Sequence, residues 1–599
     1  MKPSLRLTLL LTLAACAAAF AAKPPEAPAP PSFGETVEVD VVNVEVYVTD
    51  KNGRRITDLQ KGDFQLLEDG KPMEIAHFTS LVPPAPDASP AAAPAAPREA
   101  AAPVSPPPAA EPTHLLVYVD DQHLKPAHRA RVLRQVNDFA RANLQAADRI
   151  SVVTDDFELK VRLEFSTDRA ALERVLAEIE KIPASGIEAE VARRSAFESM
   201  MNEQETHAKR GGFCGNSVAQ FVRDYANSTR ADALRTISRL RFVVNSLAGI
   251  GGRKAVLLVT DGVPLNPGEE LLQAFVGLCG GGAAREGVRL PDELSPSDTL
   301  GRNEKSGNVE EVTLDIQSYS LEDDLQRLAA HANAQGVSLF TLQASGLQAG
   351  GGAGLAPAER LLELSAVTST LASNLRDPLV LLASETGGRA LLDANDYRAD
   401  LARMREDLAT YYSLGFVPAH HGDGKEHRLE VKVKRPGFQL RYRRSYRDKP
   451  ALERAADRTL AALLHGFEDN PLNITVEVGE QTPGQTGTVN VPIRLKIPLF
   501  KLAILNREAS FEGSLRLLVA TQGEDGRSSP LRQIPVPLQI PRKEVLSALG
   551  QFYVYTLTLQ LPPGEQRIAV AVRDELASTT SYLSRKVTVG TTEAAIVQP

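Results

Sequence analysis

Long hydrophobic runs are missing from this chain of 599 residues. A transmembrane helix needs about 18 or more consecutive apolar residues, and no segment reaches that length. The apolar run Leu7 to Ala15 follows two basic residues and has the length of a signal-peptide core. Two processing routes are open: Leu13 to Cys16 match a lipobox, which would place a lipid anchor on Cys16, whereas Ala19 to Ala21 offer a site for ordinary signal peptidase. Either route predicts a signal peptide, assigned to residues 1–22, and a periplasmic, envelope-anchored or secreted protein.

Cysteine is also rare, with only Cys16, Cys214 and Cys279 in the chain. Two cysteines without a nearby partner make a poor zinc site. Once Cys16 is removed or lipidated, the other two form an even pair in an oxidising compartment. We therefore expect a disulfide bond between Cys214 and Cys279, the alternative being two separate buried thiols.

An excess of positive charge is the third missing feature. The chain has 67 basic and 75 acidic residues, which gives a net charge of −8. This balance offers no basic field for a phosphate backbone, so nucleic acid is excluded as the expected partner. The 43% hydrophobic and 24% charged residues are typical of a globular protein, and the length predicts about three or four domains.

Signatures of catalysis are absent as well. The sequence has no GxSxG elbow, HExxH motif, phosphate-binding loop or GxGxxG after a strand. His420, His421, Asp423 and His427 form one dense group, but the glycines around Asp423 predict a solvated hairpin turn rather than a metal site. We therefore predict that the protein is not an enzyme.

The sequence does contain several segments of distinct pattern. Alternating valines from Val42 to Val48 indicate a half-buried strand within a small β module, residues 33–81. Residues 83–112 are almost wholly Pro, Ala and Ser, which predicts an extended linker. The alternation from Tyr553 to Leu561 favours a C-terminal antiparallel β-sandwich of the immunoglobulin type over residues 470–592.

Residues 113–446 alternate strands with helices, which predicts an α/β domain with a doubly wound, mostly parallel sheet and further strands at its end. The runs His114 to Val119 and Ala255 to Thr260 have the continuous apolar character of strands buried on both faces. An aspartate directly follows each run, Asp120 after the first and Asp261 after the second. Three long insertions interrupt the pattern, at residues 183–217, 263–317 and 344–377; they exceed ordinary connections, which average about 4–6 residues.

Several motifs in this order resemble a known family. They are the segment Gly251 to Gly262 with the aspartate at the end of its strand, Asp63-Phe64, Phe165 to Arg169, Glu385 to Gly388, Tyr412 to Phe416 and Arg435 to Gly437. Together they resemble the von Willebrand factor type A (VWA) domain, and more specifically the acidobacterial VWFA-related family of exported proteins. The resemblance covers about residues 37–446 and implies a doubly wound (Rossmann-like) sheet.

The resemblance also implies a metal-ion-dependent adhesion site, in which oxygen ligands at the carboxyl edge of the sheet hold Mg²⁺. Asp120 and Asp261 occupy its two aspartate positions. Gln122 and Leu124 replace its two serines, and Ser185 is only a substitute for its threonine. Since leucine cannot bind a metal, we interpret the site as degenerate, with Asp120, Gln122 and Asp261 as its remaining candidate ligands, and we expect no cofactor.

These observations favour an exported, non-catalytic, adhesion-like module that binds a protein partner at the cell envelope. The expected binding surface is the carboxyl edge of the VWA sheet, where α/β folds place their ligands, together with the three insertions. Two other hypotheses are an envelope hydrolase with its site in the insertions and a purely structural envelope scaffold.

Overall fold

A computed structural model describes most of the chain after the N-terminal segment. The described residues are 41–81, 112–156, 158–209, 216–279, 306–347, 365–420, 422–485, 487–524 and 527–590. Cys16 and Cys214 lie outside these ranges, as do the signal peptide and nearly all of the linker, so the lipid anchor and the disulfide remain predictions. Within the described ranges, no helix combines the length and apolarity that a membrane crossing requires.

Six described strands form the central sheet, in the order β10-β9-β8-β5-β6-β7. β5 (Thr113–Val119) lies parallel to β6 (Arg149–Asp156) on one side and to β8 (Arg253–Thr260) on the other. The parallel part continues through β9 (Val337–Gln343) to β10 (Ala390–Leu391), whereas β7 (Glu158–Ser166) is an antiparallel edge strand. This is the 3-2-1-4-5-6 order of a doubly wound sheet, and its switch point lies between β5 and β8.

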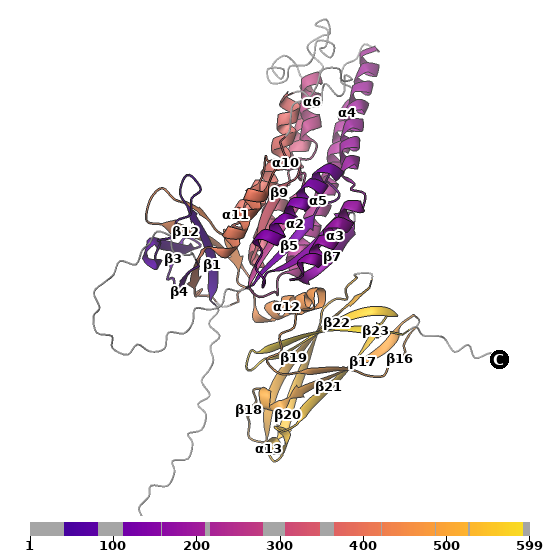
Figure 1. Cartoon of the computed structure of the whole chain (residues 1–599). Coiled ribbons are helices and arrows are strands. Elements are labelled where there is room, and N and C mark those ends of the chain that lie inside the picture. Colours follow the sequence, from indigo (N-terminus) through magenta and orange to yellow (C-terminus); the bar gives the residue numbers. More distant parts are fainter. Residues whose placement is uncertain are drawn as a thin grey trace, which may run out of the picture. The chain divides into compact units, whose positions relative to one another are not determined.

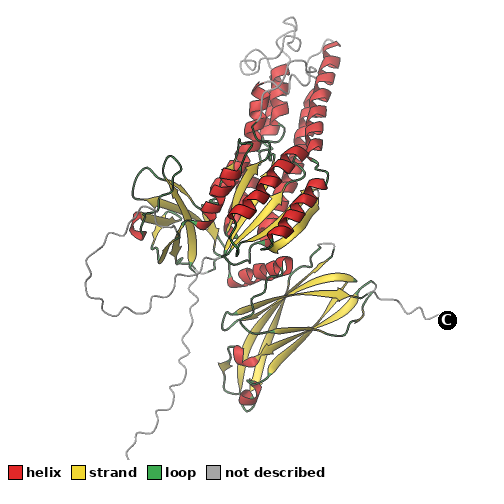
Figure 2. Ribbon diagram, in the orientation of Figure 1, coloured by secondary structure: helices red, strands yellow, loops and turns green. Residues whose placement is uncertain are grey.

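Helices cover both faces of this sheet (Figures 1 and 2). One face packs against α2 (Pro126–Asn143), α3 (Arg169–Lys181) and α11 (Arg398–Ala409), and the other against α5 (Asn216–Ser246) and α8 (Glu322–Ala334). All seven residues of β5 are buried as a result, because a parallel strand between two helical layers meets no water. The Asp168 side chain caps α3 by accepting hydrogen bonds from the backbone N–H groups of the first turn.

The described parts of the insertions are largely helical, which the sequence pattern did not predict. They contain α4 (Gly186–Lys209), α6 (Glu269–Cys279), α7 (Ser306–Gln317) and the start of α10 (Ser365–Glu385), and Figure 1 shows α4 and α6 reaching beyond the strand ends. These helices share a hydrophobic core with the first half of α5. Its large buried side chains include Phe197, Met200, Val222, Phe275 and Ile316. Burial of these side chains stabilises the helices outside the main domain.

The β module takes strands from two distant parts of the chain. β1 (Val42–Thr49) and β4 (His77–Ser80) flank β11 (Tyr412–Phe416), while β2 (Phe64–Glu68) pairs with β12 (Glu426–Val433). The other strands are β3 (Lys71–Met73), β13 (Gln439–Arg441) and β14 (Ser445–Arg447). The sequence analysis grouped the later strands with the α/β domain. β11, β12 and β13 pair with β1, β2 and β4 instead, and β14 pairs with β12. Residues from both parts form one apolar core. We call residues 41–81 and 412–447 the β module.

The C-terminal part begins with α12 (Ala451–His465) and continues as two antiparallel sheets. The first contains β15 (Thr475–Val478), β16 (Thr482–Pro483), β17 (Val489–Pro498) and β21 (Phe552–Leu561). The second contains β18 (Leu505–Asn506), β19 (Ser510–Gly523), β20 (Arg532–Pro541), β22 (Gly564–Asp574) and β23 (Thr580–Val589). Side chains of both sheets form one hydrophobic core, as in a sandwich. The immunoglobulin-type topology remains a prediction.

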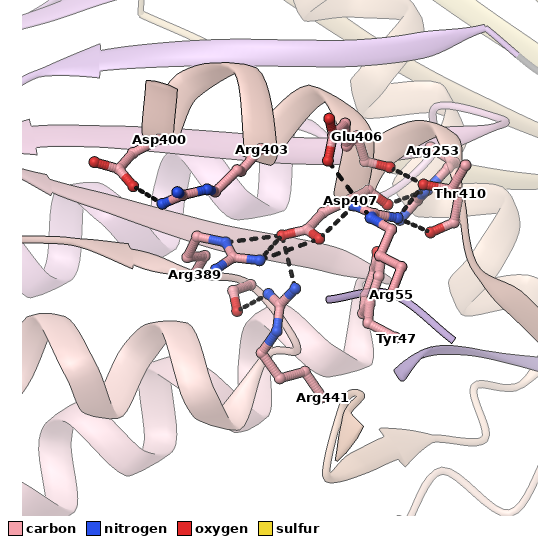
Figure 3. Close-up of polar contacts among 11 residues, drawn as sticks. Tyr47, Arg55, Arg253, Arg389, Asp400, Arg403, Glu406, Asp407, Thr410 and Arg441 are labelled. Atoms are coloured by element: carbon pink, nitrogen blue, oxygen red, sulfur yellow. Dashed lines mark hydrogen bonds and ion pairs between the residues drawn. The ribbon is translucent and has the colours of Figure 1, made fainter. Parts of the chain in front are cut away.

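A buried carboxylate links α11 to the β module (Figure 3). Asp407 is 2% exposed and forms ion pairs with Arg55 at 2.8 Å, Arg389 at 2.9 Å and Arg441 at 2.7 Å. Arg55 and Arg441 belong to the β module, whereas Arg389 lies just before β10. Nearby, the guanidinium group of Arg253 lies 4.1 Å from the ring centre of Tyr411. The three arginines compensate a charge that burial alone would make very unfavourable.

Candidate functional site

A pocket of about 880 Å³ opens at the carboxyl edge of the central sheet. It is lined by the segments that follow β5, β8 and β9 and by residues of α4, α5, α6 and α10. We call it the switch-point pocket, because β5 and β8 are the strands between which the chain order reverses. Its ionisable lining residues are His123, Lys125, His128, Glu190, Arg193, Arg194, Tyr225, Asp232, Asp261 and Glu270.

Asp120, directly after β5, is fully buried and bound to a histidine of its own loop. Both of its carboxylate oxygens lie 2.9 Å from Nδ1 of His123, and Oδ2 also accepts a hydrogen bond from the Thr260 hydroxyl at 2.7 Å. Burial by itself lowers the pKa of His123, but the carboxylates of Asp120, Asp155 and Asp261, with Asp120 foremost, raise that pKa above its ordinary value. His123 thus lines the pocket with its ring held by the carboxylate of Asp120.

Asp261, directly after β8, forms a second pair of the same kind. Nδ1 of His128 lies 2.8 Å and 3.0 Å from its two oxygens, and the backbone N–H of Lys125 donates to Oδ2 at 3.2 Å. His128 is in the first turn of α2, which begins at Pro126. The helix start thus directs this imidazole towards the adjacent strand end. Two histidine–aspartate pairs therefore lie at the switch point, one from each strand.

The other residues of the predicted metal site have different partners. Asp121 forms a buried ion pair with Arg129 at 2.9 Å, and the Gln122 amide oxygen accepts a hydrogen bond from Arg239 at 3.1 Å. The Ser185 hydroxyl donates to Asp156 at 2.7 Å, and Leu124 is fully buried in the main core. The structure thus brings Asp120 and Asp261 to adjacent strand ends but does not gather Gln122 and Ser185 around them.

These contacts allow a direct test of whether Mg²⁺ fits. Magnesium requires near-octahedral oxygen ligands at about 2.0–2.1 Å. Here an imidazole nitrogen already lies within hydrogen-bond distance of both oxygens of Asp120 and of Asp261. Leu124 offers no oxygen. The donor set therefore does not fit Mg²⁺, because each of the two carboxylates is bound to a histidine of its own.

A second layer of polar contacts supports this edge from below. Asp155, at the end of β6, is fully buried, pairs with Arg239 at 2.8 Å and accepts a hydrogen bond from the Tyr118 hydroxyl. Burial is the main cause that raises the pKa of Asp155, and its two partners oppose it. These contacts hold the strand ends in place beneath the histidine pairs.

The helical walls of the pocket are themselves joined by polar contacts. Lys125 forms an ion pair with Glu190 of α4, which lowers the pKa of that carboxyl group. On α5, the Tyr225 hydroxyl donates to Glu270 of α6 at 2.6 Å. Gly186, the first residue of α4, lies against the loop of Leu124 so closely that an added Cβ would be 2.3 Å from the Leu124 carbonyl. The first turn of α4 in the first insertion therefore packs directly against the loop that carries His123.

The sequence analysis found the two aspartates but missed His123 and His128. A usable signal was present, because both histidines follow the first strand within a segment that ends in a Pro-initiated helix. Such residues lie at the carboxyl edge of the sheet by topology alone.

No family model matches this sequence, and no curated protein matches it. Matching solved structures include BatB from Bacteroides thetaiotaomicron, which is 10% identical over 50% of this chain and 98% of its own, with a TM-score of 0.22. The von Willebrand factor domain of the pilus tip protein Mfa5 from Porphyromonas gingivalis is 12% identical over 50% of this chain and 95% of its own, with a TM-score of 0.24. A VWA protein from Catenulispora acidiphila is 11% identical over 81% of this chain and 68% of its own, with a TM-score of 0.19. VWA proteins are thus among the matches, but scores this low carry no argument, and the fold assignment here rests on the strand order.

Proposed function

We propose that this chain is an exported, non-catalytic protein-interaction module of the VWA type, related to the VWFA-related family, and that a partner protein of the cell envelope binds at the switch-point pocket. The main observation in support of this proposal is the position of the pocket, which lies between β5 and β8 with a histidine–aspartate pair at each strand end. Doubly wound sheets bind their ligands at this position.

The chemistry of the pocket favours an acidic group of the partner. Arg193 and Arg194 of α4 line it, together with His123, Lys125 and His128, which pair with Asp120, Glu190 and Asp261 respectively. A carboxylate from the partner would receive charge-assisted hydrogen bonds from this set. In this proposal, the imidazoles bind the carboxylate of the partner, as a metal ion does in a metal-dependent adhesion site.

Apolar side chains beside the pocket favour a protein over a small molecule. Ile187 and Val191 lie one helical turn apart on α4 and are 51% and 56% exposed, and Leu347, a lining residue after β9, is 65% exposed. Exposed large apolar side chains on the elements that wall a charged cavity are typical of a protein-binding surface. The hydrolase and scaffold hypotheses have no comparable observation in their support.

Capture from envelope extract tests this proposal. We expect the mature protein to retain one abundant partner, with and without EDTA, and the double variant His123→Gln/His128→Gln to retain at least tenfold less of it. The control is Leu546→Ala, which changes a residue that is 86% exposed on α13 (Val545–Ala548). Equal capture by the double variant would refute the site.

We also expect Mg²⁺ to leave the Tm unchanged. A rise in Tm that Asp261→Ala abolishes would restore a metal-dependent site, since metal at 100 times its Kd contributes about 2.7 kcal/mol.

A further inference from the structure

The C-terminal sandwich has one long strand edge without a partner. β21 lies beside β17 over all 10 of its residues (Figure 1), and no other strand of the described chain pairs with it. The strand runs from Phe552 to Leu561 and contains no charged residue, proline or glycine. The unpaired backbone groups of such an edge can pair with a further strand.

The register with β17 shows which backbone groups of β21 point to the free edge. In an antiparallel pair, successive residues alternately exchange both of their hydrogen bonds and none. Pro492 of β17 has no N–H group, and its carbonyl accepts from the N–H of Gly479, on the side of β15, at 2.7 Å. Thr558, opposite Pro492, therefore directs its own N–H and C=O groups away from β17. By alternation, the residues whose backbone groups point outwards are Phe552, Val554, Thr556, Thr558 and Gln560.

The side chains of β21 are also open to solvent. Those of the five outward-pointing residues are exposed, with 55% of Phe552 and 51% of Val554 accessible. The side chains on the other face contact the sandwich core but are only partly buried; they are Tyr553, Tyr555, Leu557 and Leu559. A further strand beside β21 would remove more of this apolar surface from water, which favours its addition.

Other strand edges of the described chain are blocked in ordinary ways. β20, the edge strand beside β19, carries Pro535, Pro537 and Pro541, and proline has no N–H group to donate. The outer edge of β23 is bridged by Asp469, which pairs with Tyr582. β7, at the edge of the central sheet, carries four charged side chains in its 9 residues. Prolines and charges hinder the addition of a strand, and β21 has neither.

A second copy of β21 fits this edge. An antiparallel pair with a two-fold axis at Thr556 would place Thr556 opposite its own copy, Val554 opposite Thr558, and Phe552 opposite Gln560. Since no residue of the strand is charged, like charges do not meet across the axis. All five outward-pointing residues of each copy would be used, which gives about ten backbone hydrogen bonds, the number in a typical protein interface.

The same register would join the two sandwich cores. It places Tyr553 opposite Leu559 of the second copy and Tyr555 opposite Leu557, so the partly buried side chains of each copy cover those of the other. An axis moved by one residue to Tyr555 would leave Gln560 without an opposite residue in the second strand. The axis at Thr556 therefore gives the most complete pairing.

We propose that the mature chain forms a symmetric dimer through β21, in which the first sheets of two sandwiches become one continuous antiparallel sheet. β21 has no charged side chain with which to select a different protein, whereas a second copy supplies a matching strand by symmetry. Two-fold dimers of this kind close on themselves and leave no free β21 edge. This inference does not depend on the switch-point pocket.

Sedimentation equilibrium of the purified mature chain, without a lipid anchor, tests the proposal. We expect a reversible dimer at micromolar concentration. Thr556→Pro removes the outward N–H group at the centre of the pair, and Thr556→Lys places like charges opposite each other, so each should weaken dimerisation at least tenfold. Thr556→Lys keeps the backbone N–H group and remains informative if Thr556→Pro folds poorly. The matched control is Gln539→Pro, on the β20 edge between Pro537 and Pro541, which should dimerise like the parent.

Cysteine cross-linking locates the two-fold axis. Thr556→Cys should form an intermolecular disulfide on oxidation, because the Cα atoms of hydrogen-bonded opposite residues are about 5.5 Å apart, within disulfide range. Val554→Cys is the control, since the axis places it four residues along the strand from its own copy, about 14 Å away. The proposal is overturned if the parent is monomeric at micromolar concentration, if Thr556→Pro and Thr556→Lys both dimerise like the parent, or if Val554→Cys cross-links as readily as Thr556→Cys.

Discussion

His114 begins the central strand with its ring against the edge of Phe165, at a centroid distance of 5.3 Å. The side chain is buried, and Nδ1 has no hydrogen-bond partner. Burial, reinforced by the nearby charges of Arg149 and Lys254, lowers the pKa of His114 to about 4. The folded chain therefore holds this imidazole neutral at a pH where the unfolded chain binds a proton.

This difference predicts acid sensitivity that begins above the usual carboxylate range. As the pH falls from about 6.5 to about 4, only the unfolded state takes up the proton, so the free energy of unfolding should decrease by up to about 3 kcal/mol. His114→Leu should flatten the pH dependence over this window, whereas His77→Gln, at an exposed position, should not. Denaturant unfolding at several pH values measures the slope. An unchanged slope in His114→Leu would contradict the assigned pKa.

At the scale of single residues, the sequence predicted the ends of strands better than the partners of charged groups. Asp120 and Asp261 were found because a continuous apolar run followed by aspartate marks a strand end. His123 and His128 were missed because hydrophobic periodicity says nothing about the direction of a polar side chain in a loop. His427 was misjudged for the same reason: it is only 7% exposed, and the Asp69 carboxylate beside it comes from a distant part of the sequence.

At the scale of elements, the insertion helices form a separate hydrophobic cluster with the first half of α5. Gly186 lets the first turn of α4 lie directly on the loop of Leu124. The sequence predicted the buried strands and most helices that cover them, because continuous runs and 3.6-residue periodicity are local signals. The insertion helices were missed because their glycine-rich flanks suggested loops. The pairing of β1–β4 with β11–β14 has no local signal at all.

The close contact at Gly186 predicts a selective loss of binding. In Gly186→Ala, the new Cβ would lie 2.3 Å from backbone atoms of Leu124, so α4 must move away. We expect at least tenfold weaker capture of the partner and faster amide exchange in α4, with exchange in β5 and β8 unchanged. Gly251→Ala is the matched control, because nothing lies within 4 Å of its added Cβ. Normal exchange in α4 of the Gly186 variant would show that the helix does not depend on this contact.

At the scale of the whole molecule, Asp407 is a single carboxylate on which α11, the segment before β10 and the β module meet (Figure 3). A buried ion pair adds little net stability when complete, but removal of one partner leaves uncompensated charge. The remaining guanidinium groups of Arg55, Arg389 and Arg441 would then repel one another.

Asp407→Asn should therefore lower the free energy of unfolding by about 3–5 kcal/mol. The control is Asp400→Asn on the same helix, which breaks an ion pair with Arg403 at 3.0 Å whose partners are 29% and 61% exposed. Exposed pairs of this kind contribute only about 0.2–1 kcal/mol. Thermal and denaturant unfolding of both variants compares the two sites. Similar losses in the two variants would mean that the Asp407 cluster is not a structural junction.

The split β module has a consequence for how the chain is made. The Tyr412 hydroxyl donates to the carbonyl of Ile56 across 356 positions of sequence. The ribosome adds about 5–20 residues per second, so β1–β4 wait roughly 20–70 s before their partner strands exist. During that interval their valine-rich edges are unpaired, and such edges readily pair with other chains. The growing chain thus carries unpaired strand edges until the last third of it has been synthesised. We therefore expect folding of this protein to depend on a chaperone that binds the unfinished chain.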